Sequence, residues 1–101
     1  MSYFKITSIL HSGNKGKRGA VRTDGRYPTR INRIVQFDCW KNIKIGQPFV
    51  MNYIKDENGN DYFGFALITS IVKDWDFIYD GVIKIETLNS IYELEQVKME
   101  V

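Results

Sequence analysis

A cluster of positive charge and glycine occupies residues 13–33 of this 101-residue chain. Half of the chain's 14 Lys and Arg residues and four of its eight glycines lie in this segment, against one acidic residue, Asp24. Guanidinium groups present planar sets of donors that match phosphate oxygens, and glycine lets backbone N–H groups approach an anion closely. The segment therefore predicts the binding of an anionic ligand. Its cations are Lys15, Lys17, Arg18, Arg22, Arg26, Arg30 and Arg33.

Two features favour a nucleic acid or a phosphate-bearing nucleotide as that ligand. Arginine outnumbers lysine five to two in the segment, and Tyr27 lies among the cations. Proteins that hold single strands combine a basic groove with aromatic rings that stack on bases. A solvated surface without a ligand is the alternative interpretation of a charged run. We expect charge-assisted contacts from four arginines, Arg22, Arg26, Arg30 and Arg33. Long-range attraction is expected from Lys15, Lys17 and Arg18. Tyr27 is expected to stack on a base.

The glycine spacing does not match the known phosphate loops. Gly13, Gly16 and Gly19 fit neither the Walker A pattern nor GxGxxG, and both patterns require a helix that residues 20–26 do not predict. The letters of residues 13–16 match the GxxG of KH domains, but that loop lies between helices. What remains is a nest of backbone N–H groups beside cations.

Residues suited to catalysis or metal binding are few and scattered. His11 is the only histidine and Cys39 the only thiol, and nothing in the sequence brings them together as a nucleophilic pair. Asp74 and Asp76 would share one face of a strand, but no His or Lys partner for acid–base work is identifiable. We therefore predict a protein that is not an enzyme and that has no cofactor, no metal and no internal disulfide.

The elements that must position the basic segment are strands. Apolar and polar residues alternate in several short runs, and no segment of ten or more residues shows a convincing helical period. Gly-containing turns separate the runs, most plainly around Asn58-Gly59. The run over 29–37 would carry cations on a rigid strand. The secondary structure of residues 38–44 is ambiguous in the sequence. Residues 73–78 interrupt the apolar pattern. We expect strands over residues 3–10, 29–37, 49–55, 62–72, 82–87 and 91–97, and 19–23 could add a short one.

About six short strands with little or no helix indicate an all-β protein. A chain of this length makes one domain, here residues 1–101, with a basic glycine-rich loop and strand at 13–33. Closing the sheet removes exposed strand edges. We therefore predict a single small antiparallel barrel or highly twisted sheet, SH3-like or OB-like.

The charge distribution leaves a second function open. Residues 1–44 carry a net charge of +8 and residues 45–101 a net charge of −6, so the folded molecule is expected to be bipolar. The aromatic share is high, and we expect most of the aromatic side chains in the core. If Trp75, Phe77 and Tyr79 are exposed, they would form a protein-binding or base-stacking patch. The alternative function is therefore a protein–protein interaction module, either an accessory or inhibitory protein that docks on an acidic groove or a homo-oligomer that joins basic to acidic faces.

The cellular compartment is predicted from sequence features that are missing. The first five residues lack the charged-then-apolar order of a signal peptide, and no apolar run approaches the ~18 residues that span a bilayer. A lone cysteine suits a reducing environment. We expect a cytoplasmic protein without a membrane partner. Small all-β sequences with a basic loop occur among bacterial and phage proteins, but none resembles this chain closely enough to transfer the role of a residue.

Overall fold

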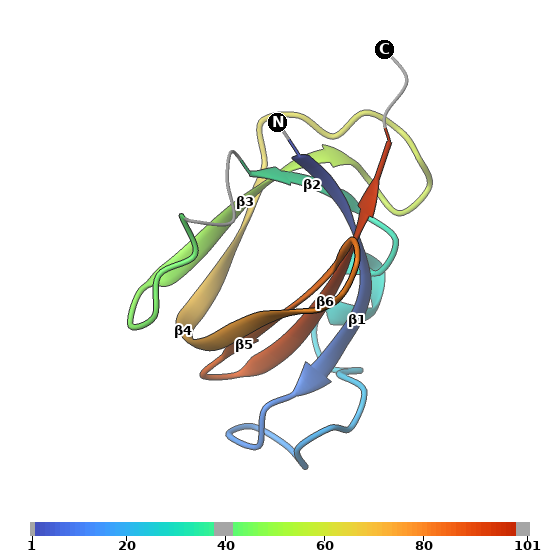
Figure 1. The fold of residues 1–101 in the computed structure, drawn as a ribbon. Coiled ribbons are helices and arrows are strands. Elements are labelled where there is room, and N and C mark those ends of the chain that lie inside the picture. Colours follow the sequence, from blue (N-terminus) through green and yellow to red (C-terminus); the bar gives the residue numbers. More distant parts are fainter. Residues whose placement is uncertain (1, 38–41, 99–101) are drawn as a thin grey trace.

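Alternating apolar residues form six strands that close into an antiparallel barrel (Figure 1). The computed structural model describes residues 2–37 and 42–98. In this part of the chain every strand pairs with the next one in sequence, and the last pairs with the first. The prediction of a small antiparallel all-β barrel is confirmed, and its strand order is the up-and-down type. The strands are β1 (Ser2–His11), β2 (Ile34–Phe37), β3 (Pro48–Lys55), β4 (Ala66–Tyr79), β5 (Val82–Thr87) and β6 (Ser90–Val97).

The inward-facing residues of all six strands fill the barrel. In β6, Tyr92 and Leu94 are buried while Glu95 is exposed, as the alternation predicts. Two rings, Phe4 and Phe37, stack at a centroid distance of 4.7 Å. Each fully buried aliphatic side chain contributes about 1.5–3 kcal/mol to the free energy of folding, so this core holds the barrel closed. Its fully enclosed members include Ile6, Val35, Met51, Ile83, Ile85 and Leu94.

The basic segment forms less strand than the sequence predicts. The strand expected over 29–37 begins only at Ile34, and Tyr27–Arg30 forms a single helical turn, α1. Pro28 fits this first turn because the missing N–H would have no helical acceptor there. Asn32 then adopts a left-handed φ of 73° and donates its N–H to the carbonyl of Ile6. The strand expected over residues 19–23 is reduced to one bridge, between Leu10 and Val21.

The fourth strand is displaced relative to the prediction. Residues 62–65 form a loop, in which Gly64 has a φ of 86°, and β4 begins at Ala66. The interruption expected over 73–78 is wrong, because these residues continue β4 and pair with β5. Two register shifts in that pairing let β4 bend around the barrel while its charged side chains face outward.

Other turns follow the sequence closely. A hairpin tip forms at residues 56–61, where Asp56 Oδ1 accepts hydrogen bonds from the N–H groups of Asn58 and Asn60, both at 2.9 Å. Only Gly59 of the Asn58-Gly59 pair has a positive φ, so the turn is not the primed type that the pair suggests. Most of the ambiguous segment 38–44, including Cys39, lies outside the described residues. No helix among residues 2–37 and 42–98 is long and apolar enough to cross a membrane.

Candidate anion-binding site

Three of the predicted arginines line one pocket on the barrel surface. Arg26, Arg30 and Arg33 share a pocket of about 370 Å³ with aromatic side chains from β3 and from the loop that precedes β4. Pockets of about 300–1,000 Å³ are typical of small-molecule sites. The aromatic lining residues are Tyr53, Tyr62 and Phe65. In Figure 1, α1 and the loop between β3 and β4 lie on the same side of the barrel.

The helical turn α1 sets the spacing of the three arginines. Arg26 precedes the turn, and its carbonyl accepts hydrogen bonds from the N–H (3.1 Å) and Oγ1–H (2.7 Å) of Thr29. Arg30 ends the turn. Arg33 follows left-handed Asn32, and its carbonyl accepts the N–H of Ile6 at 3.0 Å. The turn and its anchor on β1 thus direct three cations to one place.

The aromatic wall is a cluster of three rings, two of which are stacked. Tyr62 and Phe65 stack at a centroid distance of 4.7 Å with 15° between their planes, and Tyr53 lies 5.2 Å from Tyr62. The Phe65 carbonyl accepts the N–H of Tyr53 at 2.9 Å, which fixes the loop against β3. Phe65 is 58% exposed, so much of its ring faces solvent and the pocket.

Arg33 is part of the wall as well as a cation. Its guanidinium lies 5.0 Å from the ring centroids of both Tyr53 and Tyr62, and its Nη2 lies 3.3 Å from the carboxylate of Glu57. Although burial opposes the charged form, the Tyr53 hydroxyl and the Glu57 carboxylate raise the pKa of Arg33 above its ordinary value. Its Nε is buried and has no hydrogen-bond partner among the described residues. Arg33 therefore contributes a charge that Glu57 partly neutralises.

Arg26 and Arg30 are the uncompensated cations of the pocket. Neither makes an ion pair with an acidic side chain of the described ranges 2–37 and 42–98. Arg26 is exposed, and the Arg30 guanidinium lies 4.6 Å from the Tyr27 ring centroid. These two side chains can turn toward an anion without breaking a carboxylate contact.

Arg22 is buried and fully engaged inside the molecule. Its residue exposure is 4%, and its Nε and Nη2 donate to the carboxylate of Asp24. Its Nη1 donates to Ser90 Oγ at 2.8 Å and to the Asn89 carbonyl at 3.3 Å, and its guanidinium lies 3.8 Å from the Tyr27 ring centroid. This geometry gives Arg22 a structural role, and it occupies ring surface of Tyr27 that we expected to stack on a base.

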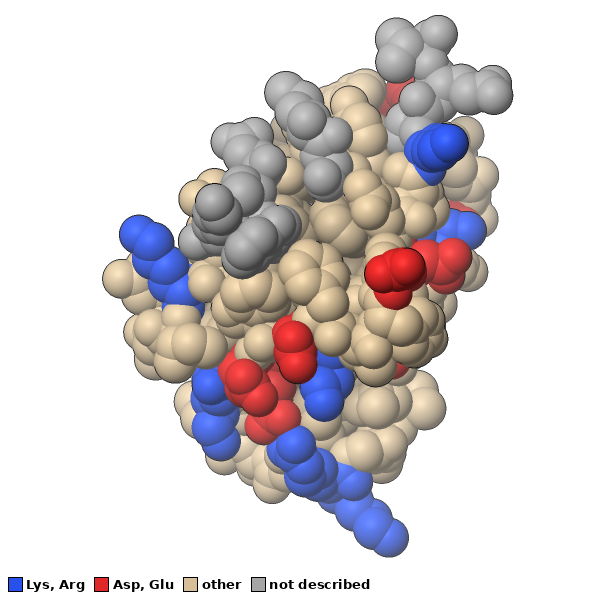
Figure 2. All heavy atoms as spheres, viewed as in Figure 1, with Lys and Arg blue, Asp and Glu red and all other residues tan. Residues whose placement is uncertain are grey.

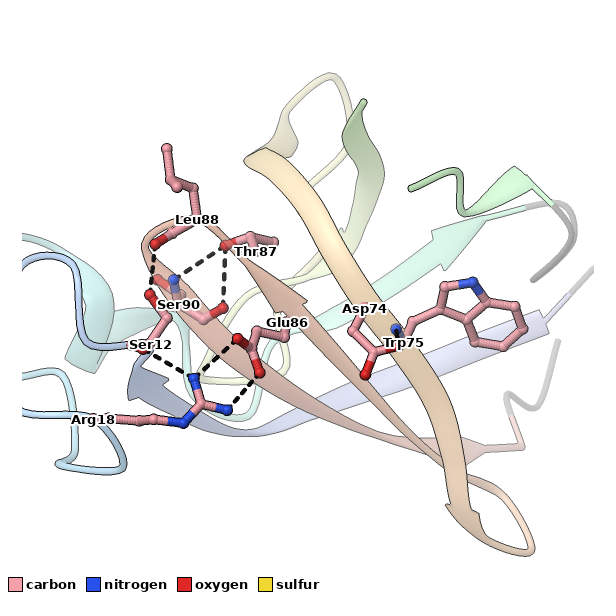
Figure 3. Close-up of polar contacts among 8 residues, drawn as sticks. All are labelled: Ser12, Arg18, Asp74, Trp75, Glu86, Thr87, Leu88 and Ser90. Atoms are coloured by element: carbon pink, nitrogen blue, oxygen red, sulfur yellow. Dashed lines mark hydrogen bonds and ion pairs between the residues drawn. The ribbon is translucent and has the colours of Figure 1, made fainter. Parts of the chain in front are cut away.

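Arg18 ties the glycine-rich loop to β5 (Figure 3). Its two terminal nitrogens donate to the two carboxylate oxygens of Glu86 at 2.9 and 2.7 Å, and Nη1 also donates to the Ser12 carbonyl at 2.9 Å. The Ser12 hydroxyl in turn donates to the Leu88 carbonyl at 2.6 Å. The Arg18 hydrogen bond lowers the pKa of Glu86. Lys15 and Lys17 are exposed on the same loop, outside the pocket.

Basic and acidic side chains meet within the molecule. Figure 2 shows Lys and Arg gathered toward the lower end of this view, directly beside a group of Asp and Glu. The Arg18–Glu86 and Arg33–Glu57 pairs each join the basic N-terminal half to the acidic C-terminal half. The expected separation into a basic and an acidic face is therefore not seen on this side.

The residues considered for catalysis do not assemble in the described structure. His11 Nε2 lies 3.8 Å from Asp24 Oδ1, and its Nδ1 is buried without a hydrogen-bond partner among the described residues. Its suggested partner, Cys39, lies outside those residues. No group of three or more His, Cys, Asp or Glu side chains within residues 2–37 and 42–98 is arranged to hold a metal ion.

The sequence prediction of the site missed its aromatic half. Tyr53, Tyr62 and Phe65 flank the hairpin tip at 56–61, and their clustering on both sides of one turn was a usable signal. Comparisons of the chain with protein-family models, with curated protein sequences and with solved structures find no match. The function must therefore be argued from the chemistry of the pocket.

Proposed function

We propose that this domain is a non-catalytic module that binds a nucleic acid or a phosphate-bearing nucleotide at the pocket beside α1. One observation carries the proposal: Arg26, Arg30 and Arg33 line the same pocket as three aromatic rings. Guanidinium groups hold phosphate through charge-assisted, geometrically matched hydrogen bonds. Aromatic rings hold bases by stacking. The pairing of both groups in one pocket suits a ligand that has an anionic part and a flat apolar part.

The arginines of the basic segment have different roles and do not form a uniform basic surface. Arg18 and Arg22 are engaged with Glu86 and Asp24, so Arg26 and Arg30 carry the direct phosphate contacts. Lys15 and Lys17 add long-range attraction from the neighbouring loop. Affinity should then depend on ionic strength, because each phosphate contact releases condensed counterions.

The experiment is a salt titration of binding to a ten-residue oligothymidylate, followed by fluorescence anisotropy. For a single strand, log K should fall by about 0.7 per phosphate contacted for each unit of log[salt]. The Arg26→Ala/Arg30→Ala variant should bind weakly and show a slope smaller by about 1.4. The matched control is Lys44→Ala/Lys98→Ala, which removes the same charge from exposed residues outside the pocket. Equal losses in both variants, or no binding by wild type at low salt, would contradict the proposal.

A second candidate function, a protein–protein interaction module, is favoured by an apolar surface on β3 and β4. Val50 and Ile68 are cross-strand partners and are 48% and 66% exposed, and Ile71 beside them is 46% exposed. At the far end of β4, Phe77 and Tyr79 are also exposed, whereas Trp75 is partly buried against the core. Exposed apolar side chains grouped on neighbouring strands are a feature of interaction sites.

Sedimentation velocity at several protein concentrations tests the self-associating form of this second candidate. Association through the apolar surface should be abolished by Ile71→Lys and should be insensitive to salt. Association of basic with acidic surfaces should instead dissolve as salt rises. A monomer under all conditions excludes self-association.

A further inference from the structure

We propose that the pocket binds an unpaired nucleobase, which stacks on Phe65 while the adjacent phosphate contacts Arg26 and Arg30. This inference rests on the proposed function and specifies the ligand: an unpaired base with its own phosphate. A simple polyanion, such as a sugar-phosphate chain without bases, lacks half of what the pocket offers.

The geometry of Phe65 is the first support. One face of its ring stacks on Tyr62, nearly parallel at 4.7 Å. No other aromatic ring of the described residues lies against Phe65, although the side chain is 58% exposed and lines the pocket. A base placed on the open face would continue the existing stack by one layer, since offset-parallel stacking is one of the two arrangements that aromatic rings favour.

The anchoring of the stack to the barrel is the second support. Tyr62 is held by a hydrogen bond from its N–H to the Ile54 carbonyl at 3.0 Å, and its ring lies within 5.0 Å of the Arg33 guanidinium. Phe65 is held through its own carbonyl by Tyr53. A platform whose backbone is already fixed does not have to be ordered when a base binds, which lowers the cost of binding.

The nearness of charge is the third support. Arg26 and Arg30 line the same pocket as Phe65, so one nucleotide can reach both groups. A base inside a duplex is covered on both faces by its neighbours and cannot stack on a side chain without being extruded. The arrangement therefore favours single strands over duplexes of the same sequence.

The test compares two ligands of equal charge on the whole protein: a ten-residue oligothymidylate and a ten-residue abasic deoxyribose-phosphate strand. Wild type should bind the oligothymidylate about tenfold more tightly than the abasic strand. Phe65→Ala should lose that factor with oligothymidylate and should bind the abasic strand as wild type does. Phe65→Trp, which keeps an aromatic face, should retain the preference.

Phe63→Ala is the matched control, since Phe63 is 62% exposed, lies two residues away and does not line the pocket. It should bind both ligands like wild type. Thermal unfolding of each variant checks that the fold is intact. A 10-base-pair duplex should bind at least about tenfold more weakly than the single strand.

The outcomes separate the inference from the function on which it rests. Equal, salt-dependent binding of both strands by wild type would overturn the inference and leave anion binding standing. No binding of either strand at low salt would remove the proposed function itself. Competition by thymidine monophosphate at matched phosphate concentration would support the same chemistry and identify a free nucleotide as the source, whereas its failure to compete identifies a strand.

Discussion

The guanidinium carbon of Arg22 lies 3.8 Å from the centroid of the Tyr27 ring, while the same side chain holds the Asp24 carboxylate and the Ser90 hydroxyl. One buried arginine thereby joins the basic segment to the start of β6. The most enclosed cation of the segment thus contacts the same Tyr27 ring as Arg30, which lines the pocket.

Replacing Arg22 should destabilise the fold. Arg22→Ala removes hydrogen bonds to Asp24, Asn89 and Ser90 and the ring contact, and we expect the free energy of unfolding to fall by about 2–3 kcal/mol. Arg22→Lys should recover little, because an ammonium cannot reproduce the planar fork. Urea denaturation measures both. Arg26→Ala is the control and should stay within about 0.5 kcal/mol of wild type; a similar loss in both variants would contradict the structural role.

The Arg22–Asp24 contact also predicts acid sensitivity. Hydrogen bonding from Arg22 lowers the pKa of Asp24 below its ordinary value of 3.8. A carboxyl with a lower pKa in the folded state stabilises the fold above its unfolded pKa, and the contribution is lost as pH falls toward the folded pKa. The stability difference between wild type and Asp24→Asn should therefore be constant near pH 5 and should shrink below about pH 4. A difference that persists unchanged at pH 2 would show that the carboxylate charge contributes nothing.

We predict that position 16 must be glycine because the His11 ring leaves no room for a side chain there. A Cβ at Gly16 would lie 2.7 Å from His11 Cε1 and Nδ1, closer than nonbonded atoms approach. Gly16→Ala should cost about 1–3 kcal/mol of unfolding free energy through overpacking. In a His11→Ala background the same substitution should cost little. Equal costs in the two backgrounds, measured by thermal or urea unfolding, would refute the packing explanation.

Glu57 should oppose ligand binding at the pocket. Its carboxylate partly neutralises Arg33 at 3.3 Å and would repel a phosphate on the neighbouring arginines. Glu57→Gln should therefore raise the affinity for oligothymidylate by about two- to fivefold at low salt, with a smaller effect at high salt. Asp80→Asn removes the same charge from a residue outside the pocket and should change affinity much less. Weaker binding by Glu57→Gln would mean that Glu57 positions Arg33 for the ligand.

The barrel could be predicted because its strands and turns are marked by patterns among residues that are close in the sequence. Alternation in residues such as Tyr92 and Leu94 fixes the inward face, and turns at Gly46, Gly59 and Gly81 separate the strands. The bounds of β2 and β4 could not be read in the same way. Residues 29–33 alternate like a strand in the sequence. In the structure α1 ends at Arg30, with Pro28 in its first turn, and left-handed Asn32 redirects the chain after it.

The sequence predicted the arginines of the site but not its aromatic rings, because the rings depend on contacts between distant residues. Charge and residue type mark Arg26, Arg30 and Arg33 in the sequence, but only the fold decides which arginine is buried against a carboxylate, as Arg22 is. The rings of Tyr62 and Phe65 come from a loop whose path depends on pairing with β3. Long-range contacts of this kind leave no periodic trace in the chain.

The central claim is that the ligand binds beside α1, and a nuclear magnetic resonance titration locates it most directly. The ¹⁵N-labelled protein would be titrated with ten-residue oligothymidylate at low salt, with backbone amides and Arg Nε–H groups observed. We predict the largest shift changes at Arg26, Arg30 and Phe65, with residues at the β4–β5 turn, such as Asp80, unchanged. Changes confined to the β4–β5 turn, or to the loop that carries Lys15 and Lys17, would contradict the account.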